Sequence, residues 1–308
     1  MIFKRIIFLI LLSFIITNTS KSDFKDIKKK AIINKPEIIF PIPNNLNRCQ
    51  TKLYVPPDFN RVEPILDVQA PTGYGLDNRF DYALNRFSNF SFPCGGGNPE
   101  ACELVKEVIL NWAKSDAAKR TSPSNHEDRH WNDTLTVNLW VASPMMAAYS
   151  FAKQIIKVPV EEDKIIKEWF EKIVKRNKHL MYGMTYKQDT QAMGVPKRAH
   201  NHALSSAIAH MELGILLNDN IQFRKAFKNY EAAIKHQRGD GSLPIETRRG
   251  GRAMFYQGRA MNALSVIAII AENQGYNIWE YDYKGKNFHN IVKFFIDFTE
   301  TNEIVFKY

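Results

Sequence analysis

The feature that most constrains the fold is an alternation of two kinds of helical segment beyond residue 100. Segments of the first kind carry one apolar stripe, as in residues 161–178, where Ile166, Trp169 and Phe170 recur at helical spacing among charged residues. Segments of the second kind, such as residues 201–217, are apolar or small nearly all round. A helix with one stripe keeps a face in solvent, whereas a helix without a polar face must be enclosed by others. The chain therefore predicts outer and inner helices that take turns.

This alternation favours antiparallel helical hairpins arranged in a ring, with a plain bundle or a solenoid as the alternatives. The helices expected from the pattern are residues 101–117, 133–156, 161–178, 201–217, 222–238, 253–274 and 286–299. The inner and outer pairs share no short repeat signature of the kind that indicates a solenoid. We therefore expect an all-α protein, an α/α toroid built as an incomplete barrel of antiparallel helix hairpins. If every inner helix runs the same way, the inner N-termini gather at one end of the ring.

The first hundred residues have a different texture. Residues 1–20 place Lys4 and Arg5 before an apolar run that is short for a membrane span, which is typical of a signal peptide, with an uncleaved anchor as the alternative. Residues 21–100 scatter proline and glycine, and we expect an irregular N-terminal arm there with possible lid loops. Residues 101–308 then form the toroid domain. We expect a periplasmic or secreted monomer that has no contact with a membrane once the signal is removed.

Export permits disulfides, and all three cysteines lie in the first third of the chain. The glycine-rich loop of the segment CGGGNPEAC lets Cys94 and Cys102 approach each other, so we favour that pair over a bridge to Cys49. The chain has no Cys-x-x-Cys pair, which argues against a zinc–thiolate site.

Positive side chains collect just before the expected inner helices. They are Arg129, Lys197, Arg198, Arg248, Arg249 and Arg252. Helix N-termini already favour anions through free N–H groups and the helix dipole. The whole chain has a formal net charge of +10. These observations predict a positive mouth that binds an acidic polymer, and export together with the lack of a recognition-helix motif argues against nucleic acid.

Two stretches near this mouth, DGSLPIETRRGGRAMFY and KRAHNHALSS, carry a resemblance. The Asn201-His202 pair, the segment DGSLPIETRR and the segment RAMFY that ends at Tyr256 resemble the alginate lyase family of polysaccharide lyases that act on poly-mannuronate. The spacing of these motifs matches the family, and a weaker likeness extends over residues 100–300. The resemblance implies cleavage of a uronate chain by β-elimination, in which the C5 proton is removed and the O4 link departs.

The resemblance also assigns the catalytic residues. Asn201, His202 and Arg249 match the family positions that hold the substrate carboxylate, and Tyr256 matches the tyrosine that acts as acid and base. Each suits its task, because arginine binds a carboxylate through two parallel N–H bonds and an amide and an imidazole can donate to the enolate-like intermediate. A tyrosine pKa is ordinarily near 10, so we expect the arginine charge to favour the phenolate. His202 remains a rival for the base.

Six further residues are candidates for substrate binding: Trp140, Arg198, His200, Arg252, Arg129 and Tyr74. Trp140 matches a family tryptophan and either stacks on a sugar or packs in the core. Arg252 either contacts substrate or braces Glu246. Tyr74 and Arg79 stand in the early segment that we expect to supply a lid.

The histidine spacing also raises the possibility of a metal site. His200 and His202 form a His-x-His pair, and His126 and His130 stand four apart, but no carboxylate accompanies them and the positive surroundings oppose a cation. We therefore expect neither a metal nor a cofactor.

Two other functions compete with the lyase. One is a non-catalytic module that binds anionic glycan through the same mouth. The other is a glycoside hydrolase, which requires two opposed carboxylates, whereas Asp240 and Glu246 are the acids near the motif.

The chain departs from the family pattern at several positions. His200 stands where the family often has asparagine, ALSS replaces the aromatic residues that commonly follow the Asn-His pair, and Gln257 replaces a histidine after Tyr256. The chain also stops at Tyr308, sooner than typical members, so we expect the ring to be incomplete. The identity of the uronate is the part of the prediction that these departures affect most.

Overall fold

The computed structural model describes residues 23–43, 62–69, 77–120, 136–176 and 194–301. Several positions singled out in the sequence lie outside these residues: the segment 1–20, Cys49, Tyr74, His126, Arg129 and His130. Within the described residues, no helix combines the length and the apolar character needed to cross a membrane.

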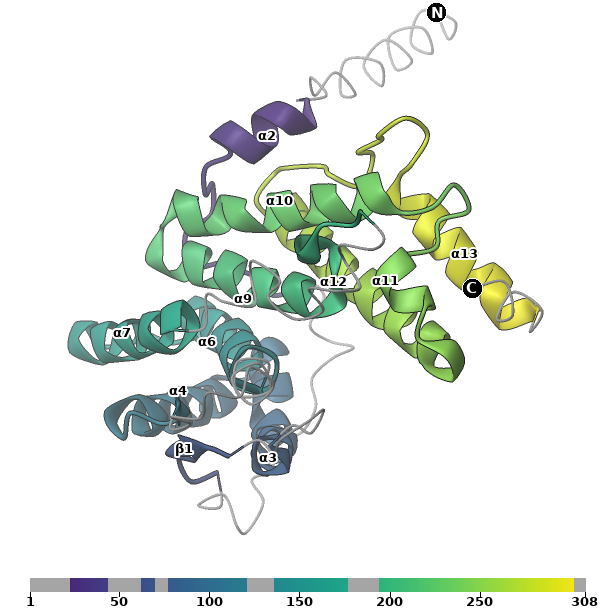
Figure 1. Cartoon of the computed structure of the whole chain (residues 1–308). Helices are drawn as coiled ribbons and strands as arrows, with labels where there is room; N and C mark the ends of the chain where they lie inside the picture. The colour runs from purple at the N-terminus through teal and green to yellow at the C-terminus, as the bar shows by residue number, and fades with distance from the viewer. Residues whose placement is uncertain (1–22, 44–61, 70–76, 121–135, 177–193, 302–308) are drawn as a thin grey trace, which may run out of the picture.

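The described part of the chain is almost wholly helical (Figure 1). Its helices are α2 (Phe24–Lys30), α3 (Asn78–Gly95), α4 (Pro99–Lys114), the π-helix η3 (Val137–Ala142), α6 (Ser143–Ile155), α7 (Val160–Arg176), the 3-10 turn η5 (Lys197–Ala199), α9 (Asn201–Leu217), α10 (Asn220–His236), α11 (Pro244–Thr247), the 3-10 turn η6 (Gly250–Arg252), α12 (Ala253–Asn273) and α13 (Phe288–Glu300). One short parallel pair of strands, β1 (Asp67–Val68) and β2 (Lys119–Arg120), accompanies them.

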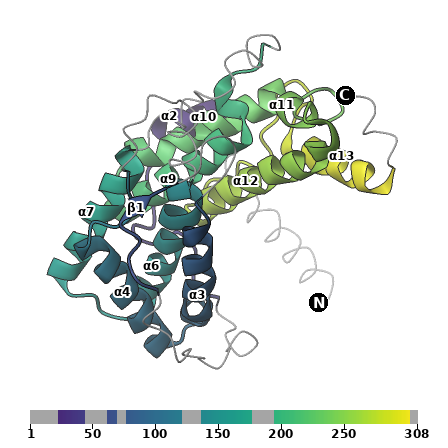
Figure 2. The same ribbon diagram turned by 60° about the horizontal axis from the view of Figure 1, so that its bottom comes forward.

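The helices form four consecutive antiparallel hairpins, namely α3–α4, η3/α6–α7, α9–α10 and α12–α13, as the α/α toroid requires. Figure 2 shows α9 beside α12, and α9 also packs against α6, α7 and α10. Enclosure on so many sides explains why nearly every residue of α9 is buried, whereas α10 buries one stripe. The inner and outer roles expected for these two helices are confirmed.

The inner helices α6, α9 and α12 run in the same direction. Asn138 of η3, which leads directly into α6, donates to Ser206 of α9 (Nδ2–Oγ, 2.9 Å), and further along both segments Ser143 of α6 bonds Glu212 of α9. The N-termini of α9 and α12 also meet, because Arg249 reaches His200 just before each helix begins. We call this N-terminal end of the inner helices the site end.

The opposite end is covered by residues 31–43, which we call the N-terminal strap. The Ile39 amide donates to Ser150 Oγ of α6 (2.9 Å), and the Glu37 amide donates to the Ile215 carbonyl of α9 (3.0 Å). Gln274, at the end of α12, donates to the Ile38 carbonyl (Nε2–O, 2.9 Å). The strap thus joins the C-terminal ends of all three inner helices, and we call this end the strap end.

One expectation about the N-terminal arm is wrong. Residues 78–95, expected to be irregular, form helix α3, and residues 24–30 form α2. The side chains of Phe80, Phe87 and Phe90 lie at helical spacing and are buried. Phenylalanine, serine and asparagine have modest helix propensity, so packing against α4 and α6 determines this helix rather than local preference.

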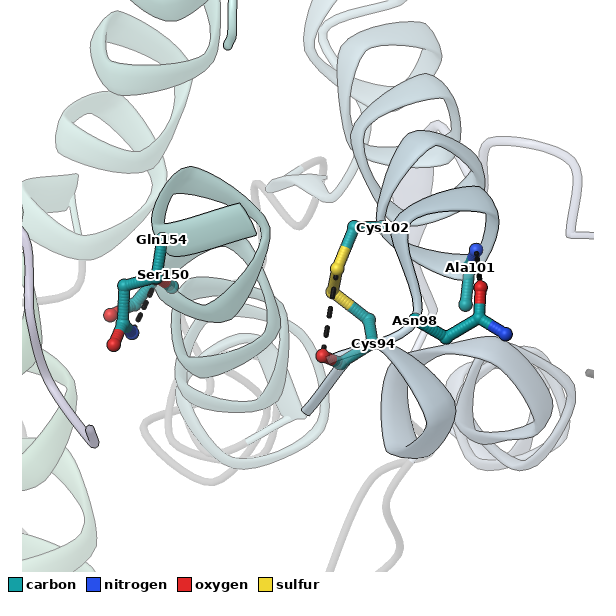
Figure 3. Close-up of a disulfide and its surroundings, with 6 residues drawn as sticks. All are labelled: Cys94, Asn98, Ala101, Cys102, Ser150 and Gln154. Carbon is teal, nitrogen blue, oxygen red and sulfur yellow. Dashed lines mark hydrogen bonds between the residues drawn. A yellow bond between two sulfur atoms is a disulfide. The ribbon is translucent and has the colours of Figure 1, made fainter. Parts of the chain in front are cut away.

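The first hairpin is closed by a disulfide. Figure 3 shows Cys94, in the last turn of α3, joined to Cys102, in the first turn of α4. Asn98 caps α4 by accepting from the Ala101 amide (3.1 Å). The expected pairing of Cys94 with Cys102 is confirmed.

Candidate active site

The first turn of α9 is held by a buried carboxyl group. Glu246, in the short helix α11, accepts from the Asn201 amide (N–Oε1, 2.8 Å) and from the Asn201 side chain (Nδ2–Oε2, 2.6 Å). Both residues are essentially inaccessible to solvent. Glu246 therefore fixes the side chain of Asn201, so the structure pairs Glu246 with Asn201 and not with Arg252, which was one of the two alternatives for Arg252.

The same burial changes the acidity of Glu246. Burial raises its pKa to about 7, although the bonds from Asn201 and the charge of Arg249 favour the carboxylate. The group therefore changes its protonation state near neutral pH. Only the carboxylate form accepts freely at both oxygens, so the hold on Asn201 depends on pH.

Arg249 and His200 form the next contact. Arg249 Nη2 donates to His200 Nε2 (2.8 Å), and the His202 amide points at His200 Nδ1 (3.2 Å). Burial and the Arg249 charge lower the pKa of His200 to about 3, so its ring is neutral. A neutral imidazole has one acceptor nitrogen, so it cannot accept fully from both donors. A ligand that takes over the Arg249 guanidinium would remove this conflict.

His202 lies beside His200 at the head of α9, with ring centroids 4.4 Å apart. Burial first, and then the positive charges of Arg249 and Arg259, hold its pKa well below the ordinary value. His202 is therefore neutral at physiological pH. In this state the ring can donate a hydrogen bond or accept a proton.

Tyr256 lies in the first turns of α12, against Arg249. The Arg249 guanidinium carbon is 4.1 Å from the centroid of the Tyr256 ring. The turn between these residues requires a left-handed residue at Gly250 (φ 54°), a conformation that glycine adopts without a steric penalty. Arg249 thus contacts both His200 and Tyr256, although these two residues are 56 positions apart in the sequence.

Trp140 lines a hollow of about 450 Å³ between α3, α6 and α12. It lies in the π-helical turn η3, where the sequence predicted a continuous α-helix, and π-turns occur often at functional sites. Its buried indole N–H has no hydrogen-bond partner among the described residues. Its ring packs partly against the core and partly faces the hollow.

Arg259 also lines this hollow and was not singled out in the sequence. It stands three residues after Tyr256 on α12, and its guanidinium lies over the exposed Phe255 ring (4.8 Å). Because residues three apart share a helix face, the i, i+3 spacing from Tyr256 was the signal that could have identified it.

The remaining candidates lie in different places. Arg252 is exposed in η6, next to this group, whereas Arg198 lines a separate cavity with α2 and α10. Arg79 pairs with Asp77 (Nη2–Oδ2, 2.6 Å) and donates to the Asp67 carbonyl, so it braces the start of α3. Arg129 and Tyr74 lie outside the described residues. Asp240 accepts from the Ser242 amide in the turn before α11 (3.0 Å).

The described residues contain no group of three or more histidine, cysteine, aspartate or glutamate side chains that could hold a metal ion. His200 and His202, the histidine pair within these residues, lie against Arg249.

The fold and this group of residues define a helical-toroid protein with a site whose charge suits an anion. The chain belongs to the alginate lyase family, because the family model of that name matches residues 96–306. The resemblance seen in the motifs is thereby confirmed.

Curated relatives agree with the family. An alginate lyase of Pseudomonas syringae pv. syringae is 27% identical over 187 residues, which are 59% of this chain and 45% of that protein. An alginate lyase of Cobetia marina is 25% identical over 186 residues, covering 59% and 45% of the two chains. The matched part of the chain thus spans a little under half the length of these relatives.

Solved structures share the fold. Alginate lyase A1-III from Sphingomonas species A1 superposes with a TM-score of 0.70 at 16% identity, over 92% of this chain and 83% of that one. An alginate lyase from Bacteroides ovatus gives a TM-score of 0.52 at 14% identity, over 89% and 81%. The expected α/α toroid is confirmed by these likenesses together with the hairpin order.

Proposed function

We propose that the protein is a polysaccharide lyase that cleaves a uronate polymer, with mannuronate-rich alginate as the preferred substrate. The observation that carries this proposal is that Arg249 contacts both His200 and Tyr256 beside the braced Asn201. Family membership supports it, and one solved neighbour is a tyrosine-to-phenylalanine variant of alginate lyase A1-III complexed with tetrasaccharide.

The reaction requires charge to move onto the sugar carboxylate. A base removes the C5 proton, the electron pair forms a C4–C5 double bond, and the C4–O4 bond breaks. The departing O4 then takes a proton. Because the C5 proton is weakly acidic while the carboxylate is fully charged, that charge must be neutralised first.

Three residues supply this neutralisation. Arg249 binds the carboxylate through its N–H fork, and its release of His200 Nε2 resolves the donor conflict described above. Asn201 and neutral His202 donate further hydrogen bonds as charge builds up. Glu246 keeps the Asn201 side chain in place, which makes it a positioning residue.

Tyr256 accepts the C5 proton and returns it to O4. Tyr256 must be a phenolate to take the C5 proton and becomes a phenol that then protonates O4, and the positive charge of Arg249 over its ring attracts the phenolate's negative charge. His202 is the rival base, because its ring is neutral and can accept a proton. Replacing Tyr256 alone distinguishes the two assignments.

Residues around the Trp140 hollow extend the site along the sugar chain. The indole N–H of Trp140 can donate to a sugar hydroxyl, and Arg259 can pair with a neighbouring carboxylate. Arg252 is assigned to the rim of the same site. We also propose that the protein is exported and acts as a monomer.

Product formation tests the proposal. Purified protein mixed with poly-mannuronate should raise the ultraviolet absorbance as unsaturated ends form, and a panel of other uronate polymers ranks the substrates. A non-catalytic glycan-binding module on the same fold would bind these polymers and leave the absorbance unchanged. Binding without any unsaturated product from the whole panel would refute the lyase.

A further inference from the structure

A second basic cavity lies on the outer face of the toroid, between α2, η5 and the first half of α10. Its volume is about 510 Å³. Six cationic side chains line it: Lys28, Lys29, Arg198, Arg224, Lys225 and Lys228. Within the described residues, no carboxylate lines it, and it shares no residue with the Arg249–Tyr256 group.

The fold brings these cations together from three separate elements. Lys28 and Lys29 end α2, Arg198 belongs to η5, and Arg224 and Lys228 stand one turn apart on α10. Like charges at this proximity repel one another, and the pair between Lys28 and Glu231 offsets only part of that repulsion. On the exposed face of a single amphipathic helix, each cationic side chain would extend into water on its own. Here the cations of three elements line one cavity instead.

The position of α2 is fixed by specific contacts. Phe24 stacks on Tyr281 with centroids 4.0 Å apart, and Lys28 pairs with Glu231 (Nζ–Oε2, 2.6 Å). Arg224 donates to the Ala31 carbonyl (Nη1–O, 3.1 Å), which ties α10 to the end of α2. Figure 1 shows α2 lying alongside α10. These contacts fix α2 against α10, so the cavity is part of the folded structure.

The lining has the chemistry of an acidic sugar site. Lys29 of α2 and Lys228 of α10 are exposed cations that line the hollow, while Asn229 lines it from a buried position and donates to the Ala203 carbonyl of α9 (3.0 Å). Ile221 adds an exposed apolar surface at 67% relative exposure. Several positive charges with one apolar side chain suit the repeated carboxylates of an acidic polysaccharide. A concave lining also fits a polysaccharide chain better than it fits a flat bilayer surface.

We propose that this cavity is a second binding site for an acidic polysaccharide chain, separate from the residues that cut it. The site holds one part of a long polymer while another part occupies the site end. The choice of a uronate as the acidic chain rests on the proposed function. The presence of a second anion-binding site does not rest on the proposed function.

Affinity electrophoresis in gels that contain poly-mannuronate tests the proposal. All proteins carry Tyr256→Phe, so that the polymer is not cut, and excess mannuronate trisaccharide occupies the site end. The test variant is Lys29→Glu with Lys228→Glu. The matched control is Lys157→Glu with Lys164→Glu, which makes the same charge change at exposed lysines on and before α7.

We expect the test variant to lose about tenfold in affinity for the polymer, and the control to stay within about twofold. An equal loss in both variants, or no loss in either, overturns the second site. So does a test variant that keeps its polymer affinity but no longer floats with phosphatidylserine vesicles, since the cavity would then bind lipid. If wild-type protein forms no unsaturated ends while the two variants still differ, the lyase fails and the second site stands.

Discussion

The two ends of the inner helices use buried charge in opposite ways. At the site end, Arg249 and Arg259 act on buried imidazoles, and the nearby carboxyl group of Glu246 is occupied by Asn201. Positive charge therefore predominates. Such an end is arranged for an anion that comes from outside the protein.

At the strap end, the charges balance within the fold. Glu37 binds Lys153 (2.6 Å) and Lys167, and both lysines also bind Asp163 at 2.7 and 2.8 Å. Each cation thus has two acidic partners. This end contributes to stability and offers little charge to a ligand.

The pH dependence of the two ends has opposite sign. Burial raises the pKa of Glu246, so its contribution to stability falls as pH rises from about 4.5 to about 7. Burial also opposes ionisation of Glu37 and Asp163, but hydrogen bonds from Lys153 and Lys167 outweigh it and lower both pKa values. Their contribution is present above the ordinary carboxyl pKa and is lost as pH falls. The inner helices therefore carry the charge that suits a ligand at one end and the balanced ion pairs that stabilise the fold at the other.

The largest effect should follow from Tyr256→Phe. Turnover of poly-mannuronate should fall about 10³-fold, because the proton acceptor is lost, while thermal stability changes little. Steady-state kinetics and a melting curve measure both. The matched control is Tyr283→Phe, because Tyr283 also has a cation over its ring (Lys235, 4.9 Å) but lies in another part of the fold. Near-normal turnover in Tyr256→Phe would assign the role of general base to His202 instead.

Glu246→Gln should lower kcat/KM by about tenfold to 100-fold, because glutamine cannot accept from both Asn201 donors and the amide shifts. In wild-type protein kcat/KM should rise with pH through about 7, as Glu246 ionises and accepts at both oxygens. The variant should lack this rise. Steady-state kinetics across pH test the positioning role of Glu246. The control is Glu272→Gln, which changes an exposed glutamate near the far end of α12. A pH profile in Glu246→Gln that matches wild type would argue against the role.

Glu37→Gln should destabilise the strap end without changing kcat. We expect a loss of about 1 kcal/mol in the free energy of unfolding at neutral pH, since the pairs are partly exposed and screened. The loss should vanish as pH falls through the carboxyl range. Urea unfolding at several pH values measures it. Asp297→Asn, which removes an exposed pair with Lys293, should cost less than about 0.5 kcal/mol, and equal losses from the two changes would contradict the distinction.

The smallest effect on activity is expected between the two ends, at Glu212→Gln. Burial raises the pKa of Glu212 well above its ordinary value, and a bond to Ser143 opposes this rise. The variant should match wild type below the ordinary carboxyl pKa of about 4.5 and become relatively more stable as pH rises above it, because the unfolded wild-type chain ionises Glu212 there while the folded chain keeps it protonated. Melting temperatures from acidic to neutral pH test this, and parallel curves would show that burial does not raise the pKa of Glu212.

The sequence predicted the inner helices best. Residues 201–217 were expected as a helix and form α9 with the same bounds, because an all-apolar run between an Asn-His pair and a turn leaves few alternatives. Helix α3 was missed, since its phenylalanines gain helical structure only by packing against α4 and α6. The π-turn around Trp140 was also missed, because nothing in the periodicity distinguishes it.

Motif spacing identified Arg249 and Tyr256, and the structure brings them into contact. The pairing of Glu246 with Asn201 was not predicted, because the two residues are 45 positions apart and meet only when α11 folds onto α9. Arg198 illustrates the same limit. It adjoins the Asn-His motif in sequence, yet the η5 turn places it in the cavity beside α10.

The most direct test of the central claim compares poly-mannuronate with the same polymer after reduction of its carboxyl groups. Mass spectrometry of the digests reports both cleavage and whether water has been added. The account predicts unsaturated products, lighter by one water per cleavage than hydrolysis products, from the acidic polymer alone, because Arg249 needs a carboxylate to bind. Hydrated products, or equal cleavage of the reduced polymer, would contradict it.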